Sequence, residues 1–303
     1  MIKRELSLLF RVSVLVGASQ AQKAADQPKP EPAWLKAALS SRVVYSVPGM
    51  DRVKVDRDIG YKQIGSTQLK MDVYRPLELN KTALRPAVIF IHGGYLPADL
   101  PVSGLPKEWG VFLSYGQLVA ASGFVGITFN HRYFGSFNAL RDSQADVTDL
   151  VAYVRKHAAE LGVDRDHLSL WFFSGAGPLL CDPLRQPEPY IHSLIAYYTI
   201  LDLQPMRKEH PETVSEEVAR DLSPVSCINS APGPVPPLFI GRAGLDTPAI
   251  DTALDQFVQS ALARNLSVEI INHPQGHHGF DARDNDDRSR EIIRATLDFI
   301  RAH

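Results

Sequence analysis

The chain has 303 residues, of which 45% are hydrophobic and 22% are charged, as in an ordinary globular protein. Its 32 basic and 34 acidic residues leave a formal net charge of -2. This balance excludes a large excess of positive charge that would attract nucleic acid or an anionic membrane. A small neutral molecule is therefore the expected partner, and the composition specifies no oligomeric state.

Two cysteines, Cys181 and Cys227, are present. They exclude a cysteine framework and a C-x-x-C metal or redox pair. Whether they form a disulfide depends on the distance between their Cα atoms, which the sequence does not contain. Their pairing stays open at this point.

The N-terminal segment has the residue order of a secretory signal. A basic pair comes first, an apolar stretch follows, and small residues end the segment at Ala21. We therefore expect residues 1–21 to be a signal peptide and the protein to be periplasmic or secreted. Glu5 and Arg11 interrupt the pattern and favour the alternative, a cytoplasmic N-terminus. No other segment approaches the ~20 apolar residues of a membrane helix, so stable membrane insertion is not expected.

Residues 22–50 are rich in Ala, Lys, Gln and Pro, which predicts a flexible or extended leader before a single domain over residues 51–303. Two antiparallel edge strands are expected first in this domain, over residues 53–61 and 69–76. The unbroken apolar run in residues 86–94 then predicts a strand buried on both faces of a parallel sheet.

The rest of the chain alternates between helical and strand patterns. Helices are predicted at 114–123, 146–162, 254–265 and 289–303, and strands at 124–130, 167–173, 196–200, 237–241 and 267–272. This alternation predicts an α/β fold with one open, mostly parallel sheet and helices on both faces. It also places Asp146 and Asp149 in the first turn of their helix, where they would complement its dipole.

Three polar residues follow predicted strands of this sheet, where ligands gather. Ser174 ends one strand, Asp246 lies just past another, and His278 follows a third. Their order along the chain, Ser then Asp then His, is the order that α/β-hydrolases use. A serine hydroxyl needs an imidazole to remove its proton and a carboxylate to orient that imidazole, and all three groups are present.

Hydrolysis also needs hydrogen-bond donors aimed at the oxyanion. The stretch "FIHGGY" provides backbone for this purpose, because Gly93 and Gly94 let the chain turn without a Cβ in the way. His92, in the same stretch, is expected to pack and hydrogen-bond within its loop.

Five motifs occur in the order and spacing of a known superfamily: "VIFIHGGY", "GITFNHR", "DLVAYVRKHAAELGVDRDHLSLWFFSGAG", "PPLFIGRAGLD" and "HPQGHHGF". From about Lys70 to the C-terminus the chain resembles the α/β-hydrolases, above all their dienelactone hydrolase-like and HGG-type esterase/lipase members. The resemblance implies an α/β-hydrolase fold and a reaction that requires no metal and no organic cofactor.

The resemblance also implies a role for each site residue. Ser174 would be the nucleophile, His278 the general base and Asp246 its orienting carboxylate. The backbone N–H groups of three further residues would form the oxyanion hole, namely Gly94, Tyr95 and Gly175.

Several assignments have rivals. Asp246 could instead cap the following helix, with Asp251 as the orienting acid. His273 and His277 compete with His278 for the role of base. A zinc site built from these histidines is not expected, because no cluster with ligand spacing lies nearby.

The sequence departs from the usual G-x-S-x-G, since Phe172 and Ala176 stand where glycines are typical. A phenylalanine ring beside a tight turn would cost ~1 to 3 kcal/mol unless its neighbours make room. Leu96 also stands where some HGG members carry an aromatic residue. This difference weakens any assignment of a particular member's substrate to this chain.

The expected function is a serine hydrolase that cleaves carboxylic esters. Residues 201–236 offer the only room for a lid, and this stretch is short, so small or medium acyl groups are favoured over long lipids. A peptidase or amidase with the same triad is one alternative. A binding protein that keeps the fold without the chemistry is the other, and Phe172 is the feature that favours it.

Overall fold

A computed structural model of the chain describes residues 33–77, 84–94, 105–132 and 136–303. The chain divides into two compact units, residues 1–37 and residues 38–303, and the second contains the sheet. The predicted signal peptide lies outside the described residues.

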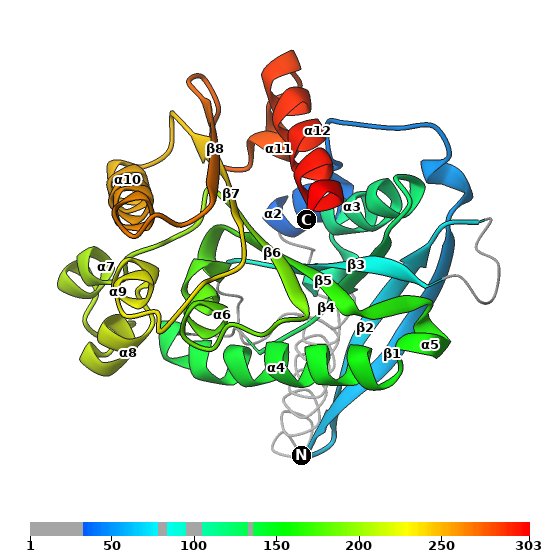
Figure 1. Cartoon of the computed structure of the whole chain (residues 1–303), viewed down its shortest axis with the longest axis horizontal. Coiled ribbons are helices and arrows are strands. Elements are labelled where there is room, and N and C mark those ends of the chain that lie inside the picture. The colour runs from blue at the N-terminus through cyan, green and yellow to red at the C-terminus, as the bar shows by residue number, and fades with distance from the viewer. Residues whose placement is uncertain (1–32, 78–83, 95–104, 133–135) are drawn as a thin grey trace, which may run out of the picture. The chain divides into compact units, whose positions relative to one another are not determined.

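The second unit contains one sheet of eight strands in the order β1-β2-β4-β3-β5-β6-β7-β8 (Figure 1). The first two strands form an antiparallel hairpin, β2 pairs antiparallel with β4, and all later neighbours are parallel. The strands are β1 (Lys54–Ile64), β2 (Thr67–Arg75), β3 (Arg85–Ile91), β4 (Val125–Phe129), β5 (Val163–Phe173), β6 (Ile191–Tyr197), β7 (Leu238–Ala243) and β8 (Val268–His273).

Helices cover both faces of the sheet, which confirms the predicted α/β class. The helices of the described ranges, whichever unit they belong to, are α2 (Ala33–Ser40), α3 (Gly110–Ala121), α4 (Leu140–Lys156), α5 (Ala158–Leu161), α6 (Cys181–Arg185), α7 (Gln204–Glu209), α8 (Glu216–Asp221), α9 (Pro224–Asn229), α10 (Pro248–Ala263), α11 (Phe280–Arg283) and α12 (Asp287–Ala302). The 3₁₀ segments of the described residues are η1 (Met50–Arg52), η3 (Pro106–Glu108), η4 (Phe137–Ala139) and η5 (Ser174–Leu180).

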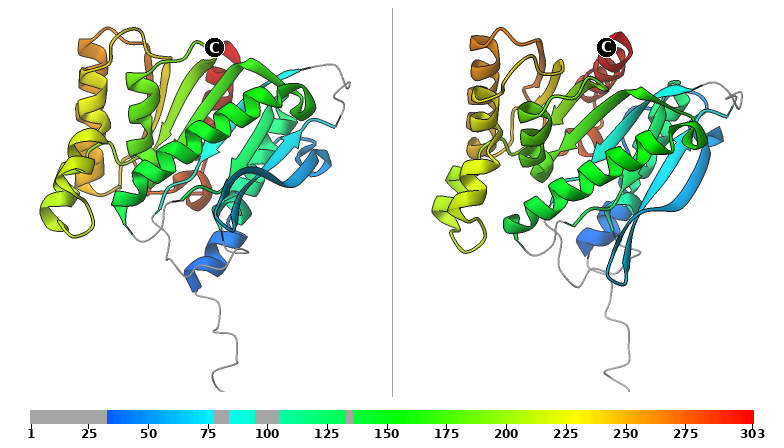
Figure 2. Two further views of the ribbon diagram at one scale, coloured as in Figure 1. Left: turned by 90° about the horizontal axis from the view of Figure 1, so that it is seen from below. Right: turned by 60° about the horizontal axis from the view of Figure 1, so that its bottom comes forward.

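The buried residues form two cores, one on each face of the sheet, because successive side chains of a strand point to opposite sides. In β5, Leu170 and Phe172 face the core shared with α4 and α10, whereas Trp171 and Phe173 face the core shared with α3 and α12. Figure 2 shows α4 crossing its face of the sheet. A strand buried on both faces reads as a continuous apolar run, as residues 170–173 at the end of β5 and residues 87–91 in β3 do.

The second unit begins before the predicted boundary at residue 51. Val43 is buried in the core on the α3 side, and the backbone N–H of Val44 donates to the carbonyl of Asp281 at 2.8 Å. Residues 33–40 are helical. The prediction of a flexible or extended leader over residues 22–50 is therefore wrong for its last part, where apolar side chains find room in the core.

The long helix α4 begins at Leu140, six residues before the predicted start at Asp146. Asp146 is therefore buried in the second turn instead of lying in the first, and it pairs with Arg132 at 2.9 Å and Lys62 at 2.7 Å. Burial raises the pKa of Asp146, but hydrogen bonds from these two cations bring it below its ordinary value. The carboxylate thus ties the segment after β4 to the edge hairpin rather than serving the helix dipole.

Cys181 and Cys227 form a disulfide, with their Cα atoms 5.3 Å apart. The bond links the start of α6 to α9 across a sequence separation of 46 residues. By restricting the unfolded chain, a cross-link that closes a loop of this length raises the free energy of the unfolded state by about 4 kcal/mol at room temperature in the chain-entropy model. It holds the segment that follows Ser174 against the helices between β6 and β7.

Every helix within the described ranges is too short or too polar to span a bilayer.

Candidate active site

Ser174 lies at a sharp turn between β5 and η5. Its φ of 51° is left-handed, a conformation that is uncommon for residues other than glycine and that recurs at functional sites. The carbonyl of Ser174 accepts a hydrogen bond of 3.0 Å from the N–H of Ile200, in the segment after β6. The turn is therefore held by a neighbouring strand end as well as by its own strand.

Two glycines allow other backbone segments to approach this turn. A Cβ on Gly93 would lie 2.2 Å from the carbonyl oxygen of Phe173 and 2.5 Å from the nitrogen of Gly175. A Cβ on Gly177 would lie 2.0 Å from the carbonyl oxygen of Ile200. The segment after β6 thus comes closest to the chain at Gly177, and not at the position before it. This explains why an alanine is tolerated at position 176.

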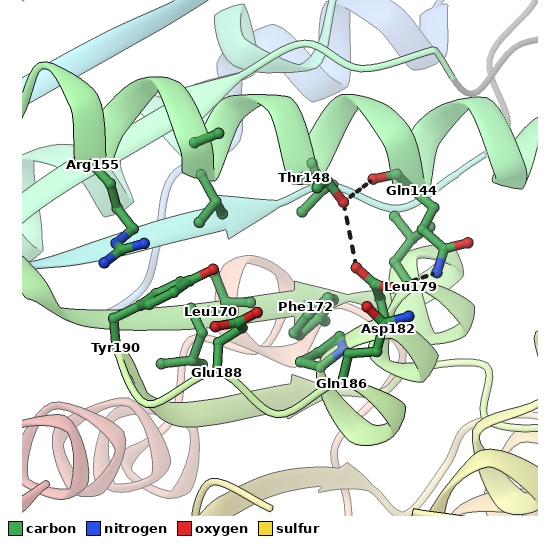
Figure 3. Close-up of a pocket in the computed structure, with 15 residues that line it drawn as sticks. Gln144, Thr148, Arg155, Leu170, Phe172, Leu179, Asp182, Gln186, Glu188 and Tyr190 are labelled. Atoms are coloured by element: carbon green, nitrogen blue, oxygen red, sulfur yellow. Dashed lines mark hydrogen bonds between the residues drawn. The ribbon is translucent and has the colours of Figure 1, made fainter.

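The ring of Phe172 does not crowd the turn. It is fully buried on the α4 face of the sheet, and its neighbour in register on β6 is Ala196, whose small side chain leaves room. Figure 3 shows the ring with Leu170 and Leu179 at a cavity of about 160 Å³ under α4. The ring packs in the same core as Ala176 and Leu179 of η5, next to this cavity, so the departure from G-x-S-x-G leaves the turn at Ser174 intact.

The structure brings Ser174, His278 and Asp246 into one hydrogen-bonded chain. Ser174 Oγ lies 2.8 Å from His278 Nε2, and His278 Nδ1 lies 2.7 Å from Asp246 Oδ2. A carboxylate can only accept, so Nδ1–H donates to Asp246 and Nε2 is left to accept the serine proton. The side chain of Asp246 is only 2% exposed, which strengthens its interaction with the imidazole.

The rival acids have other positions. Thr247, and not Asp246, stands at the N-cap position of α10, and Asp246 Oδ1 accepts the N–H of Thr247 at 2.7 Å. Asp251 lies inside α10 and pairs with Arg242 at 3.4 Å. Burial raises the pKa of Asp251. Its carboxylate therefore belongs to a separate ion pair.

The rival histidines are also engaged elsewhere. His273 is buried, and its Nε2 lies 3.1 Å from both carboxylate oxygens of Asp286 at the start of α12. His277 Nδ1 lies 3.0 Å from Asp284 Oδ1. Of the three histidines in this loop, His278 is the one that reaches Ser174.

The predicted oxyanion residues are only partly described. Gly94 has a left-handed φ of 77°, and it lines the same cavity as Ser174 and Gly175. Tyr95 lies outside the described residues. The backbone at Gly94 and Gly175 therefore borders the space in front of the serine hydroxyl.

The loop that carries Gly93 and Gly94 is supported by two stacked imidazoles. His92 and His131 are buried with their ring centroids 3.7 Å apart, and His131 Nε2 lies 3.1 Å from the carbonyl oxygen of His92. Burial lowers the pKa of His92 well below its ordinary value, and it lowers the pKa of His131 to about 4. Both rings are therefore neutral near pH 7, so they stack without charge repulsion.

The cavity in front of Ser174 has a volume of about 490 Å³. Its apolar wall comes from Phe137, Ile200 and Met206, and its polar side includes His210 and Glu212. Within the residues that the structure describes, no three His, Cys, Asp or Glu side chains are grouped closely enough to hold a metal ion.

Sequence reasoning missed two residues beside His278. The Tyr198 ring lies 4.7 Å from the imidazole, and the Tyr198 hydroxyl donates to Asp281 Oδ1 at 2.7 Å. Burial raises the pKa of Tyr198 well above its ordinary value, so this hydroxyl stays a donor. Burial also raises the pKa of Asp281, against the lowering effect of its hydroxyl donors. Asp281 lies three residues after His278 in the sequence. That spacing does not indicate that Asp281 accepts the hydroxyl of Tyr198.

Comparisons with known proteins show similarity to esterases of the same fold. The profile of the BD-FAE family matches residues 71–181, which include the HGG loop and Ser174. An esterase from the planctomycete Thermogutta terrifontis, Est2 in its propionate-bound form, superposes with a TM-score of 0.64 at 21% identity, over 84% of this chain and 96% of that one. The chain has the fold of the α/β-hydrolases. Est2 phosphoramylated by tabun gives a TM-score of 0.63 at 20% identity, over 84% and 94% of the two chains.

The chain is also similar to a curated protein of Mycobacterium tuberculosis, described as the probable carboxylic ester hydrolase LipM. The two are 24% identical over 263 residues, which cover 75% of this chain. The chain spans 56% of the length of that relative.

Gly93 tests the packing of the elbow. Gly93→Ala places a methyl group against the backbone at Phe173 and Gly175, which cannot move away as a flexible side chain would. We expect the free energy of unfolding to fall by about 3 kcal/mol, measured by urea denaturation. Gly233→Ala is the matched control, because a Cβ there meets nothing within 4 Å and should change stability little. Equal stability of the two variants would contradict this description of the elbow.

Proposed function

We propose that this α/β-hydrolase is a serine hydrolase that cleaves carboxylic esters through an acyl-enzyme. The observation that carries the proposal is the hydrogen-bonded chain from Ser174 through His278 to Asp246, with the serine hydroxyl at a cavity. An isolated hydroxyl is a weak nucleophile, and this arrangement is the one that activates it.

In the proposed reaction, Ser174 Oγ attacks the acyl carbonyl while His278 Nε2 takes the hydroxyl proton. Asp246 keeps the imidazole in the required tautomer and stabilises its positive charge. The backbone N–H groups of Gly94, Tyr95 and Gly175 would donate to the oxyanion. His278 then gives its proton to the leaving alcohol, and the same base activates water to release the acid.

The relatives support this chemistry. LipM is described as a probable carboxylic ester hydrolase. Thermogutta terrifontis esterase 2 is known in forms phosphonylated by sarin and phosphorylated by paraoxon. For the present chain these likenesses support ester hydrolysis over the two alternatives, a binding protein and a peptidase. The accommodated ring of Phe172 removes the feature that favoured a binding protein.

We propose small to medium acyl groups as substrates. The cavity of about 490 Å³ has an apolar wall made by Phe137, Ile200 and Met206, which suits a short hydrocarbon chain. The thermophilic Est2 has been described with propionate and with butyrate bound, which agrees with an acyl group of this size.

We also propose that the protein is exported. The residue order of positions 1–21 supports this, as does the disulfide between Cys181 and Cys227, since disulfides persist in oxidising compartments.

Labelling with a fluorophosphonate probe tests the nucleophile. We expect the probe to attach to Ser174 and to leave Ser174→Ala unmodified, because the probe reacts with an activated serine. Ester turnover by Ser174→Ala, His278→Ala and Asp246→Asn should fall by about 10³-fold or more, since the three side chains act as a unit.

Two neighbours serve as matched controls for these variants. Asp251→Asn and His277→Ala change the same residue types close by, and each should keep kcat/KM within about twofold of the wild type. A folded wild-type protein that the probe does not modify would reject the enzyme and leave the binding protein. Faster cleavage of p-nitroanilides than of the matching esters would favour the amidase.

A series of p-nitrophenyl esters tests the acyl size. We expect kcat/KM for the butanoate to exceed that for the dodecanoate by about tenfold or more, because the longer chain outgrows the apolar wall. A steady rise of kcat/KM up to the dodecanoate would show that the cavity does not limit the acyl group.

Export is tested by fractionating cells that express the full chain. We expect the protein outside the cytoplasm with a new N-terminus close to residue 22, measured by mass spectrometry. Protein that stays in the cytoplasm with residues 1–21 attached would contradict the proposal.

A further inference from the structure

Both nitrogens of the His278 ring are already engaged, Nε2 by Ser174 and Nδ1 by Asp246. These two bonds lie in the plane of the ring. They do not prevent the plane from tilting, so its tilt depends on other contacts. The Tyr198 ring supplies such a contact, with its centroid 4.7 Å from that of the imidazole and the two planes at 57°. The His278 side chain is 39% exposed, so few other groups restrict its orientation and the contact with the Tyr198 ring is important for it.

Tyr198 is itself held in an unusual position. Its φ of 40° is left-handed, which is a rare and strained conformation for a bulky residue. Its backbone N–H donates to the carbonyl of Gly241 at 3.1 Å, and its ring is packed near Phe173 and Phe280. Such a conformation persists only where the surroundings enforce it, and strained residues of this kind cluster at functional sites.

The anchor of the Tyr198 ring is the carboxylate of Asp281. Asp281 is fully buried, and its two oxygens accept the hydroxyls of Tyr198 and Tyr115, each at 2.7 Å. Asp281 is only three residues past His278. The same short segment therefore carries the imidazole and the carboxylate that anchors the Tyr198 ring beside it.

The segment that carries Tyr198 also holds the nucleophile. Two residues further on, the N–H of Ile200 donates to the carbonyl of Ser174 at 3.0 Å. The chain from Tyr198 to Ile200 therefore contacts the base with a side chain and the serine with its backbone. Its position sets how the two reacting groups face each other.

We propose that Tyr198, anchored by Asp281, is a positioning residue that holds the His278 imidazole in line between Ser174 and the leaving group. Tyr198 does not touch the reacting atoms, and it acts by restricting the tilt of the base. The inference rests on the proposed function, because it assigns a role within that reaction.

Paired substitutions at Tyr198 test the inference. Tyr198→Leu removes the ring, whereas Tyr198→Phe keeps the ring and removes only the bond to Asp281. We expect kcat for a p-nitrophenyl ester to fall by about 50-fold in Tyr198→Leu and by about fivefold in Tyr198→Phe, because small displacements of a catalytic group cost up to about 10²-fold. KM should stay within about twofold, since Tyr198 is absent from the residues that line the cavity at Ser174.

The rate of fluorophosphonate labelling gives a second readout and should fall in parallel with kcat. Tyr197→Phe is the matched control, because it removes a buried hydroxyl bond of 2.5 Å to Thr296 from the adjacent residue. We expect this control to keep kcat within about twofold even where it lowers the melting temperature. If Tyr198→Leu does not fold, Asp281→Asn removes the charge of the anchor at nearly constant shape and should lower kcat by about fivefold.

Three results would overturn the inference. These are an unchanged kcat in the folded variants of Tyr198 or Asp281, a loss confined to KM, or an equal loss of kcat in Tyr197→Phe. Failure of the wild-type protein to react with the probe or with esters would instead reject the proposed function itself. The two failures are therefore distinguishable.

Discussion

The site depends on how closely two backbone segments approach the turn at Ser174. The loop after β3 approaches it through Gly93, and the segment after β6 approaches it at Ile200, beside Gly177. A side chain on either glycine would collide with backbone atoms, which cannot rotate out of the way. This contact holds the serine in its left-handed conformation and places the Gly94 backbone at the cavity in front of its hydroxyl.

The order of strands explains why distant residues converge there. In the sheet, β3, β5, β6, β7 and β8 are consecutive neighbours and run parallel. Their carboxyl ends therefore meet along one edge, where each contributes one part. The parts are Gly94, Ser174, Tyr198, Asp246 and His278, taken from these strands in that order. Each of these residues lies close in sequence to the end of its strand, so the rigid sheet sets the spacing between the residues.

Burial then decides the charge state of the groups that support the site. His92 and His131 are neutral because a buried imidazolium would lose its hydration, and neutral rings can stack. Asp281 is buried as well, but two tyrosine hydroxyls satisfy its oxygens. Near the candidate site, both oxygens of the buried Asp281 thus have donors, and the two stacked imidazoles carry no charge.

The sequence by itself determined the mostly parallel α/β sheet, and it predicted Ser174, Asp246 and His278 as candidate site residues, because periodicity and residue order can be read along a chain. It did not determine the disulfide, the ion pairs of Asp146, the place of Val43 in the core, the contact of Tyr198 with His278 or the bond from Tyr198 to Asp281. These were decided by tertiary structure, since each joins residues whose distance depends on how separate elements pack. The left-handed turns at Ser174 and Tyr198 belong to the same class, because neighbouring strands, and not the residues themselves, enforce them.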